Sequence, residues 1–127
     1  MNTPDEIKQI LRTYGHRISF AYLFGSSARG EATAASDLDI AIHCRSSDPE
    51  ECFIAKLDLQ ADLCRSLGRN DIDILVLNTA PILLLDEVVR QGILLHEQEP
   101  AAREKFELDT LHQAIDFKSQ RLAIIGA

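Results

Sequence analysis

The chain has 127 residues, enough for one compact domain and little more. Its 46% hydrophobic and 26% charged residues are typical of a globular protein with a buried core. The formal net charge is −7 and the basic residues are scattered, so we expect no direct nucleic-acid binding. We therefore treat residues 1–127 as a single domain.

Targeting signals and disulfides are not expected either. The first 15 residues lack the apolar core of a signal peptide, and no stretch reaches the length of a membrane span. Cys44, Cys52 and Cys64 are odd in number and include no CxxC pair. This pattern favours reduced thiols over a disulfide framework or a zinc site, which predicts a cytoplasmic protein with no membrane contact.

The first elements are a helix, a strand and a turn. Thr3-Pro4-Asp5-Glu6 combines an N-cap, an early proline and a capping-box glutamate, which predicts a helix over 3–14 that ends at Gly15. The apolar run 18–24 predicts a buried strand. The small residues 26–30 that follow suit a turn or one helical turn.

A second strand and a second helix follow. Residues 37–44 alternate, so Leu38, Ile40 and Ile42 should face one way and Asp37, Asp39, Ala41 and His43 the other. Residues 47–50 should open a helix that Gly68 ends. Apolar residues recur on this helix at helical spacing: Ile54, Leu57, Ala61 and Cys64.

The second half of the sequence predicts two more strands and two more helices. The strands are expected over 72–77 and 93–96, one helix from 79–81 to Gly92, and a long amphipathic helix after Pro100. The last helix is marked by Leu108, Leu111, Ile115 and Leu122. This order predicts an α/β (α+β) fold, with a small mixed sheet of about four strands and helices packed mainly on one side.

Asp37 and Asp39 are the first candidate site residues. Residues two apart on a strand share a face, so both carboxylates should project together. At a separation of about 5 Å and an effective dielectric near 20, two such charges repel by about 3 kcal/mol. Water relieves this repulsion at a solvated strand end, and a divalent cation between the carboxylates would turn it into stabilisation. Carboxylate oxygens suit Mg²⁺.

The segment after the first strand is the second candidate. Gly25 allows close backbone approach to a ligand, and a strand-to-helix turn directs free N–H groups at an anion. Ser26 adds a hydroxyl donor and Arg29 a positive charge for phosphate oxygens. Taken alone, the segment also fits an ordinary tight turn.

Asp73 is the third candidate because it lies inside the apolar run 72–77, where a carboxylate is costly unless it is paired or solvated. Asp71, two residues earlier, is its rival. We prefer Asp73 because Asp71 follows Gly68-Arg69-Asn70 and belongs to a predicted loop.

Gly25-Ser26, ten intervening residues and Asp37-Leu38-Asp39-Ile40 resemble the signature of the polymerase-β-like nucleotidyltransferase superfamily. The length and the segments GSSARGEATAASDLDIAI and DIDILVL are similar to its smallest members, the minimal nucleotidyltransferases. Ser27 and His112 depart from the residues that many relatives carry. Neither departure touches the carboxylates.

The resemblance implies a nucleotidyltransferase fold and a role as antitoxin beside an all-helical HEPN ribonuclease toxin. Such a protein transfers AMP from ATP to a tyrosine hydroxyl of the toxin and can form a hetero-oligomer with it. By the same resemblance, Gly25, Ser26 and Arg29 would bind the nucleotide. Asp37, Asp39 and Asp73 would bind Mg²⁺ and catalyse the transfer.

Two alternatives stay open at this point. A small-molecule (aminoglycoside-type) nucleotidyltransferase is disfavoured because such enzymes usually add a second domain for the acceptor. A non-catalytic antitoxin would block its toxin by binding alone. The last helix and residues 83–89 could offer apolar surface for a partner, unless all of that surface packs on the sheet.

Overall fold

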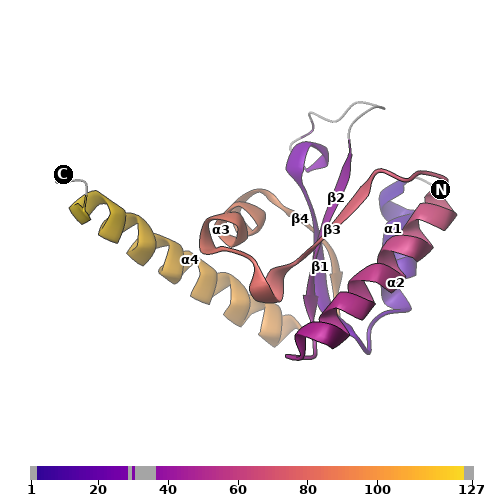
Figure 1. The fold of residues 1–127 in the computed structure, drawn as a ribbon, viewed down its shortest axis with the longest axis horizontal. Helices are drawn as coiled ribbons and strands as arrows, with labels where there is room; N and C mark the ends of the chain where they lie inside the picture. The colour runs from indigo at the N-terminus through magenta and orange to yellow at the C-terminus, as the bar shows by residue number, and fades with distance from the viewer. Residues whose placement is uncertain (1–2, 29, 31–36, 125–127) are drawn as a thin grey trace.

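A computed structural model describes residues 3–28, 30 and 37–124 and confirms the predicted order of elements (Figure 1). The elements are α1 (Thr3–Arg12), β1 (Ile18–Phe24), the 3-10 turn η1 (Gly25–Ser27), β2 (Leu38–Cys44), α2 (Pro49–Leu67), β3 (Ile72–Val76), the 3-10 turn η2 (Leu77–Thr79), α3 (Ile82–Gln91), β4 (Ile93–Glu97) and α4 (Pro100–Ile124). Helix α1 ends two residues before the predicted Tyr14, and β3 ends one residue before the predicted Leu77.

The strands form one mixed sheet in the order β3-β2-β1-β4. β1 pairs antiparallel with β2 and with β4, whereas β2 and β3 run parallel. This arrangement confirms the predicted α/β class with a small mixed sheet. β1 lies inside the sheet and is buried along almost its whole length, as its apolar residues on both faces require. Its one polar residue, Ser19, is buried as well and donates to Glu99 Oε1 at 2.9 Å.

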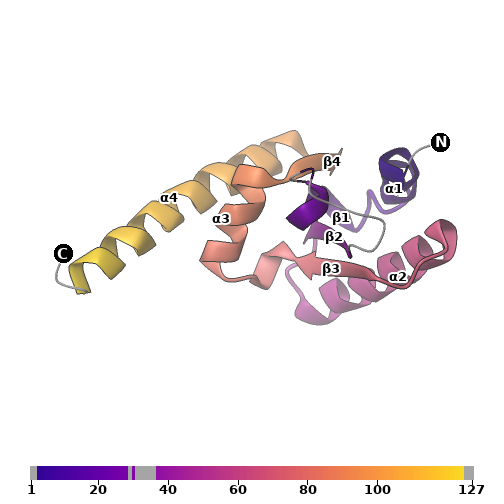
Figure 2. The same ribbon diagram turned by 90° about the horizontal axis from the view of Figure 1, so that it is seen from above.

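Helices cover both faces of the sheet (Figure 2). On one face, α1 and α2 pack over residues such as Ile18, Ile40 and Ile42. On the other face, α3 and the first half of α4 pack over Phe20 and Tyr22. Our expectation of helices mainly on one side was therefore wrong. A strand without a polar face needs cover on both sides, and β1 is such a strand.

Helix α2 has the predicted ends but buries a different face. Asp48 caps its first turn by accepting from the N–H of Glu50, and Gly68 ends it in the left-handed conformation. In the predicted apolar stripe, Ile54, Leu57 and Ala61 are exposed, and Cys64 alone packs against the core. The residues that face the core are instead Cys52, Ala55, Leu59 and Leu63. These also repeat at helical spacing, and the small side chains among them allow α2 to approach the sheet.

The buried face of α2 leads to a prediction about the stability of the protein. Leu59 is fully buried, so Leu59→Ala should lower the free energy of unfolding by about 2–5 kcal/mol. The matched change Leu57→Ala, on the exposed face, should stay within about 0.5 kcal/mol of the wild type. Urea denaturation of the two variants measures both values. Equal losses would show that the burial of α2 is misassigned.

Helix α4 packs on α3 through Thr110 and Ala114, which are buried. Buried Asp86 of α3 accepts hydrogen bonds from Arg90 Nε at 2.8 Å and from Lys118 Nζ of α4 at 3.0 Å. Burial by itself raises the pKa of Asp86, but these two cations hold it below its ordinary value.

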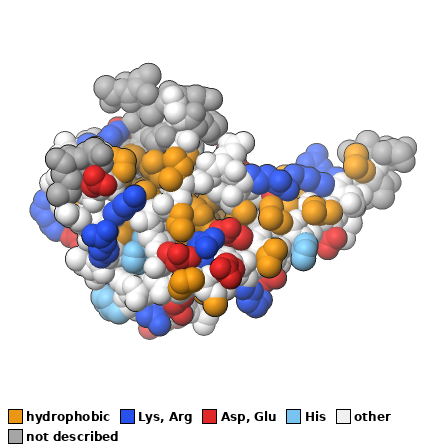
Figure 3. Space-filling view, turned by 180° about the vertical axis from the view of Figure 1, so that it is seen from behind, with side chains coloured by type: hydrophobic (Ala, Val, Ile, Leu, Met, Phe, Trp, Pro, Cys, Tyr) orange, Lys and Arg blue, Asp and Glu red, His pale blue; other side chains and the backbone are white. Residues whose placement is uncertain are grey.

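The apolar residues that marked the last helix point away from this contact, so the predicted amphipathic stripe is largely exposed. Leu108, Ile115 and Leu122 are 58%, 54% and 59% exposed. Figure 3 shows hydrophobic side chains spaced along this helix on the side of the molecule opposite to the view of Figure 1. None of the helices in the described ranges has the length and apolarity that a membrane span requires.

Candidate active site

The turn after β1 is built against the start of β2. Phe24 is the register partner of Asp39, so Gly25 and Ser26 emerge from β1 beside that carboxylate. Gly25 has a φ of +70°, and a Cβ atom at this position would lie 2.4 Å from Asp39 Oδ2. Only glycine fits here without displacing the carboxylate. The structure thus brings the predicted turn and the predicted carboxylate together.

Asp39 and Asp73 lie side by side on neighbouring strands. They are register partners in the parallel pairing of β2 with β3, so their side chains leave the same face of the sheet. That face is the one that α3 and α4 cover further along the strands, because Ala41 shares it with Asp39. Asp73 is exposed and Asp39 is half-buried. Two carboxylates therefore meet at the edge where β2 and β3 begin.

Asp37 and Asp71 lie one step further toward this edge. Asp37 is exposed and directly precedes β2. Asp71 accepts two hydrogen bonds from Arg69, at 2.5 Å from Nε and 2.8 Å from Nη2. The pKa of Arg69 is raised, mainly by this hydrogen bond, with a smaller contribution from the charge of Asp37. The Arg69–Asp71 pair, signalled by two opposite charges two residues apart, went unrecognised in the sequence.

These contacts distinguish the role of Asp73 from that of Asp71. The carboxylate of Asp71 is occupied by the Arg69 fork, and this contact lowers its pKa, so its role is to hold the loop before β3. We expect Asp73→Asn to abolish nucleotidyl transfer and Asp71→Asn to retain at least about a third of the rate. Single-turnover transfer rates of both variants measure this. Loss of transfer only in Asp71→Asn would reverse the assignment.

These side chains suit a Mg²⁺ ion that is bound together with phosphate groups better than a metal ion that is bound by protein side chains alone. Across residues 3–28, 30 and 37–124, no group of three or more His, Cys, Asp or Glu side chains could hold a metal ion. Mg²⁺, however, commonly takes one or two carboxylates and completes its shell with phosphate oxygens and water. Asp39 and Asp73 beside an open glycine turn match that requirement. The predicted phosphate ligand Arg29 lies outside the described residues.

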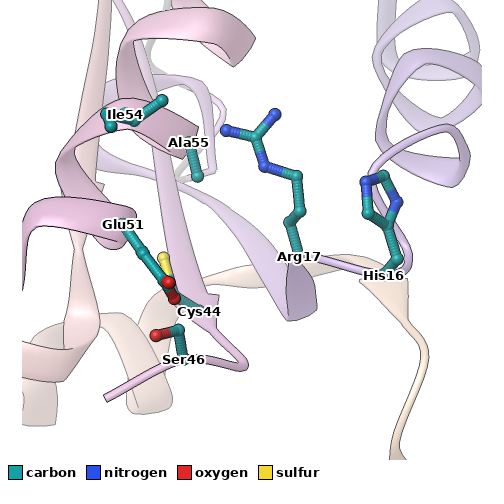
Figure 4. A pocket seen from close by; sticks show the side chains of 7 residues that line it. All are labelled: His16, Arg17, Cys44, Ser46, Glu51, Ile54 and Ala55. Atoms are coloured by element: carbon teal, nitrogen blue, oxygen red, sulfur yellow. The ribbon is translucent and has the colours of Figure 1, made fainter. Parts of the chain in front are cut away.

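A separate cavity of about 220 Å³ lies at the other end of β2 (Figure 4). Its lining includes Cys44, the last residue of β2, and Ala55 of α2, so it is not part of the carboxylate edge. Cys44, Cys52 and Cys64 are all free thiols, as expected.

His43, the histidine that shares the Asp39 face, stacks on Phe20 with ring centroids 4.6 Å apart. Burial lowers the pKa of His43. This side chain therefore packs against an aromatic ring, and its burial disfavours the charged form.

Comparison with known proteins identifies a family that matches most of the chain and a similar protein of known activity. Residues 5–101 match the family described as polymerase beta, nucleotidyltransferase. The chain is 30% identical over 121 residues to the protein adenylyltransferase MntA of Shewanella oneidensis, which covers 95% of this chain and 84% of the relative.

Solved structures of toxin–antitoxin complexes are similar as well. A chain of one complex with AMP-PNP superimposes with a TM-score of 0.78 at 29% identity, covering 97% of this chain and 95% of that one. A chain from the tri-AMPylated Shewanella oneidensis HEPN toxin in complex with its MNT antitoxin gives a TM-score of 0.72 at 27% identity. That match covers 98% of this chain and 93% of the other.

Proposed function

Because this chain belongs to the polymerase-β nucleotidyltransferase family, we propose that it is an antitoxin that transfers AMP from ATP to a tyrosine hydroxyl of a HEPN toxin. The observation that carries the proposal is the pairing of Asp39 with Asp73 beside the Gly25 turn. The similar MntA protein is a protein adenylyltransferase, and a similar antitoxin forms a complex with an AMPylated HEPN toxin.

In this proposal, one group of residues binds the nucleotide and a second group binds Mg²⁺ and acts on the acceptor. The backbone of Gly25, the hydroxyl of Ser26 and the charge of Arg29 hold the triphosphate. Asp37, Asp39 and Asp73 would hold Mg²⁺ together with the phosphate oxygens, and the ion would supply positive charge to the triphosphate and to the leaving pyrophosphate. Asp39 lies directly against the Gly25 turn, so the proposed nucleotide-binding and metal-binding groups are adjacent.

The transfer step balances without a further reactant. The tyrosine oxygen forms a bond to the α-phosphorus of ATP, and the bond from that phosphorus to the bridging oxygen breaks. Pyrophosphate leaves with the electron pair. Asp73, exposed at the start of β3, accepts the proton of the tyrosine hydroxyl. The chain acts in this proposal as one domain over residues 1–127, in the cytoplasm and in a hetero-oligomer with its toxin.

Turnover distinguishes this enzyme from an antitoxin that only covers the toxin. With ATP and Mg²⁺, a tenth of an equivalent of the chain should inhibit all of the ribonuclease activity of the proposed HEPN toxin. Inhibition that needs one equivalent and no ATP would favour the binding protein. Consumption of ATP with an aminoglycoside and without the toxin would favour the small-molecule enzyme.

A further inference from the structure

Within the described part of the chain, the end of α4 buries no side chain after Ala114, and Lys118 holds it to α3 through the ion pair with Asp86. Ala114 is the last buried residue of this helix, and every side chain from Ile115 to Leu122 is exposed. The helix continues past α3 into solvent (Figure 1). Isolated helices shorter than about 12–15 residues are marginal in water, and most helices in proteins depend on packing of an apolar face. This end of α4 therefore lacks the contact that usually stabilises a helix.

Four apolar residues of α4, of which three are exposed and Leu111 is partly buried, form a regular stripe. Leu108, Ile115 and Leu122 are seven residues apart, with Leu111 between the first two. This is the heptad spacing at which one helix packs along another. At 100° per residue, the centre of the stripe lies about 110° from the centre of the buried Thr110 and Ala114 face, and Leu111 is the stripe residue nearest to that face. We call these four leucine and isoleucine residues the outer stripe.

A helix of different sequence fits the outer stripe better than a second copy of the chain. Lys118 occupies the heptad position that follows Leu111, and its ammonium already neutralises part of the Asp86 charge. In a parallel pair of α4 helices, Lys118 would face the same lysine. In an antiparallel pair with Leu111 opposite Ile115, it would face Leu108. Both arrangements would remove water from an ammonium whose carboxylate partner, Asp86, is already shared with Arg90, which leaves a net positive charge at the contact and is costly. A different helix can place a carboxylate there.

The position of the carboxylates indicates which partner this is. Asp39 and Asp73 project from the sheet face that α3 and α4 cover, so an acceptor protein must approach on the α4 side of the molecule. We propose that the outer stripe docks a helix of the HEPN toxin, with an acidic residue of that helix opposite Lys118. This proposal rests on the proposed function for the identity of the partner and adds the surface that holds it.

Binding without ATP tests the docking surface separately from catalysis. Calorimetry would measure the affinity of the full chain for the proposed HEPN toxin. The variant Leu108→Glu/Ile115→Glu should bind at least about a hundredfold more weakly. The control Phe53→Glu/Leu57→Glu changes two residues on α2 that are 55% and 46% exposed, on the other side of the sheet. It should bind within about threefold of the wild type, and circular dichroism should show that both variants are folded.

The outcomes separate the two proposals. Wild-type affinity in the α4 variant, or equal losses in both variants, would overturn the docking surface. So would a wild-type dimer that the α4 variant alone disrupts while toxin binding stays unchanged, because the stripe would then belong to a second copy. A complex that depends on the outer stripe but transfers no AMP would support the docking surface and refute the proposed enzymatic function.

Discussion

Asp37→Asn/Asp39→Asn protein should transfer AMP at least on the order of a thousandfold more slowly than the wild type. Asp39 lies against the nucleotide turn and Asp37 is exposed two residues before it, so the double change removes two of the three proposed Mg²⁺ ligands. Because it also removes two neighbouring negative charges, the fold should be retained without Mg²⁺. Transfer rates and thermal unfolding curves measure the two effects.

A matched control removes two charges elsewhere. Glu50 and Glu51 are exposed in the first turn of α2, where acidic residues stabilise the helix by a few tenths of a kcal/mol each. Glu50→Gln/Glu51→Gln should keep the wild-type transfer rate. Wild-type transfer by the Asp37/Asp39 variant, or equal loss in the control, would remove these aspartates from the site.

Gly25→Ala should weaken binding of the non-hydrolysable analogue AMP-PNP with Mg²⁺ at least about tenfold. The new methyl group would stand 2.4 Å from Asp39 Oδ2, so either the carboxylate or the turn must move. Ser26→Ala removes a single hydroxyl donor worth about 1 kcal/mol, and its effect should be smaller. Calorimetry measures all three affinities.

Gly68→Ala is the control for backbone strain. Gly68 has a φ of +66°, close to that of Gly25, but a Cβ there would meet nothing within 4 Å. Both alanine variants should lose about 1 kcal/mol of unfolding free energy from the left-handed conformation. Only Gly25→Ala should lose nucleotide affinity. Similar nucleotide affinity in both would show that the contact between Gly25 and Asp39 has no functional role.

The order of the elements and several of their ends could be predicted from the sequence, because they depend on residues that are close together in the chain. Strand β1 has the predicted ends because an apolar run stops at a glycine, and α2 begins after Asp48 and ends before Gly68 as their capping chemistry requires. The glycine turn and the pair of aspartates also follow from short-range pattern. That Asp39 and Asp73 share a face at one edge required the parallel pairing of β2 with β3, which the sequence does not encode locally.

The buried faces of the helices were less predictable, because they depend on tertiary packing. Helix α2 carries two apolar stripes, and periodicity does not distinguish the stripe with Leu59 from the one with Leu57. In α4 the sequence left open whether Leu108 and Ile115 pack on the sheet or face a partner, and in the structure they are exposed while the small Ala114 is buried. The exposed stripe that results is the surface that we assign to the toxin.

Intact-mass spectrometry of the toxin tests the central claim most directly. The toxin should be incubated with ATP, Mg²⁺ and either the wild-type chain or Asp73→Asn, with complex formation checked in parallel. We expect the wild type to increase the mass of the toxin by one or more AMP groups, located on tyrosine by fragmentation, and Asp73→Asn to leave the mass unchanged while still binding. A toxin that is fully inhibited by the wild-type chain yet unchanged in mass would contradict the enzymatic account.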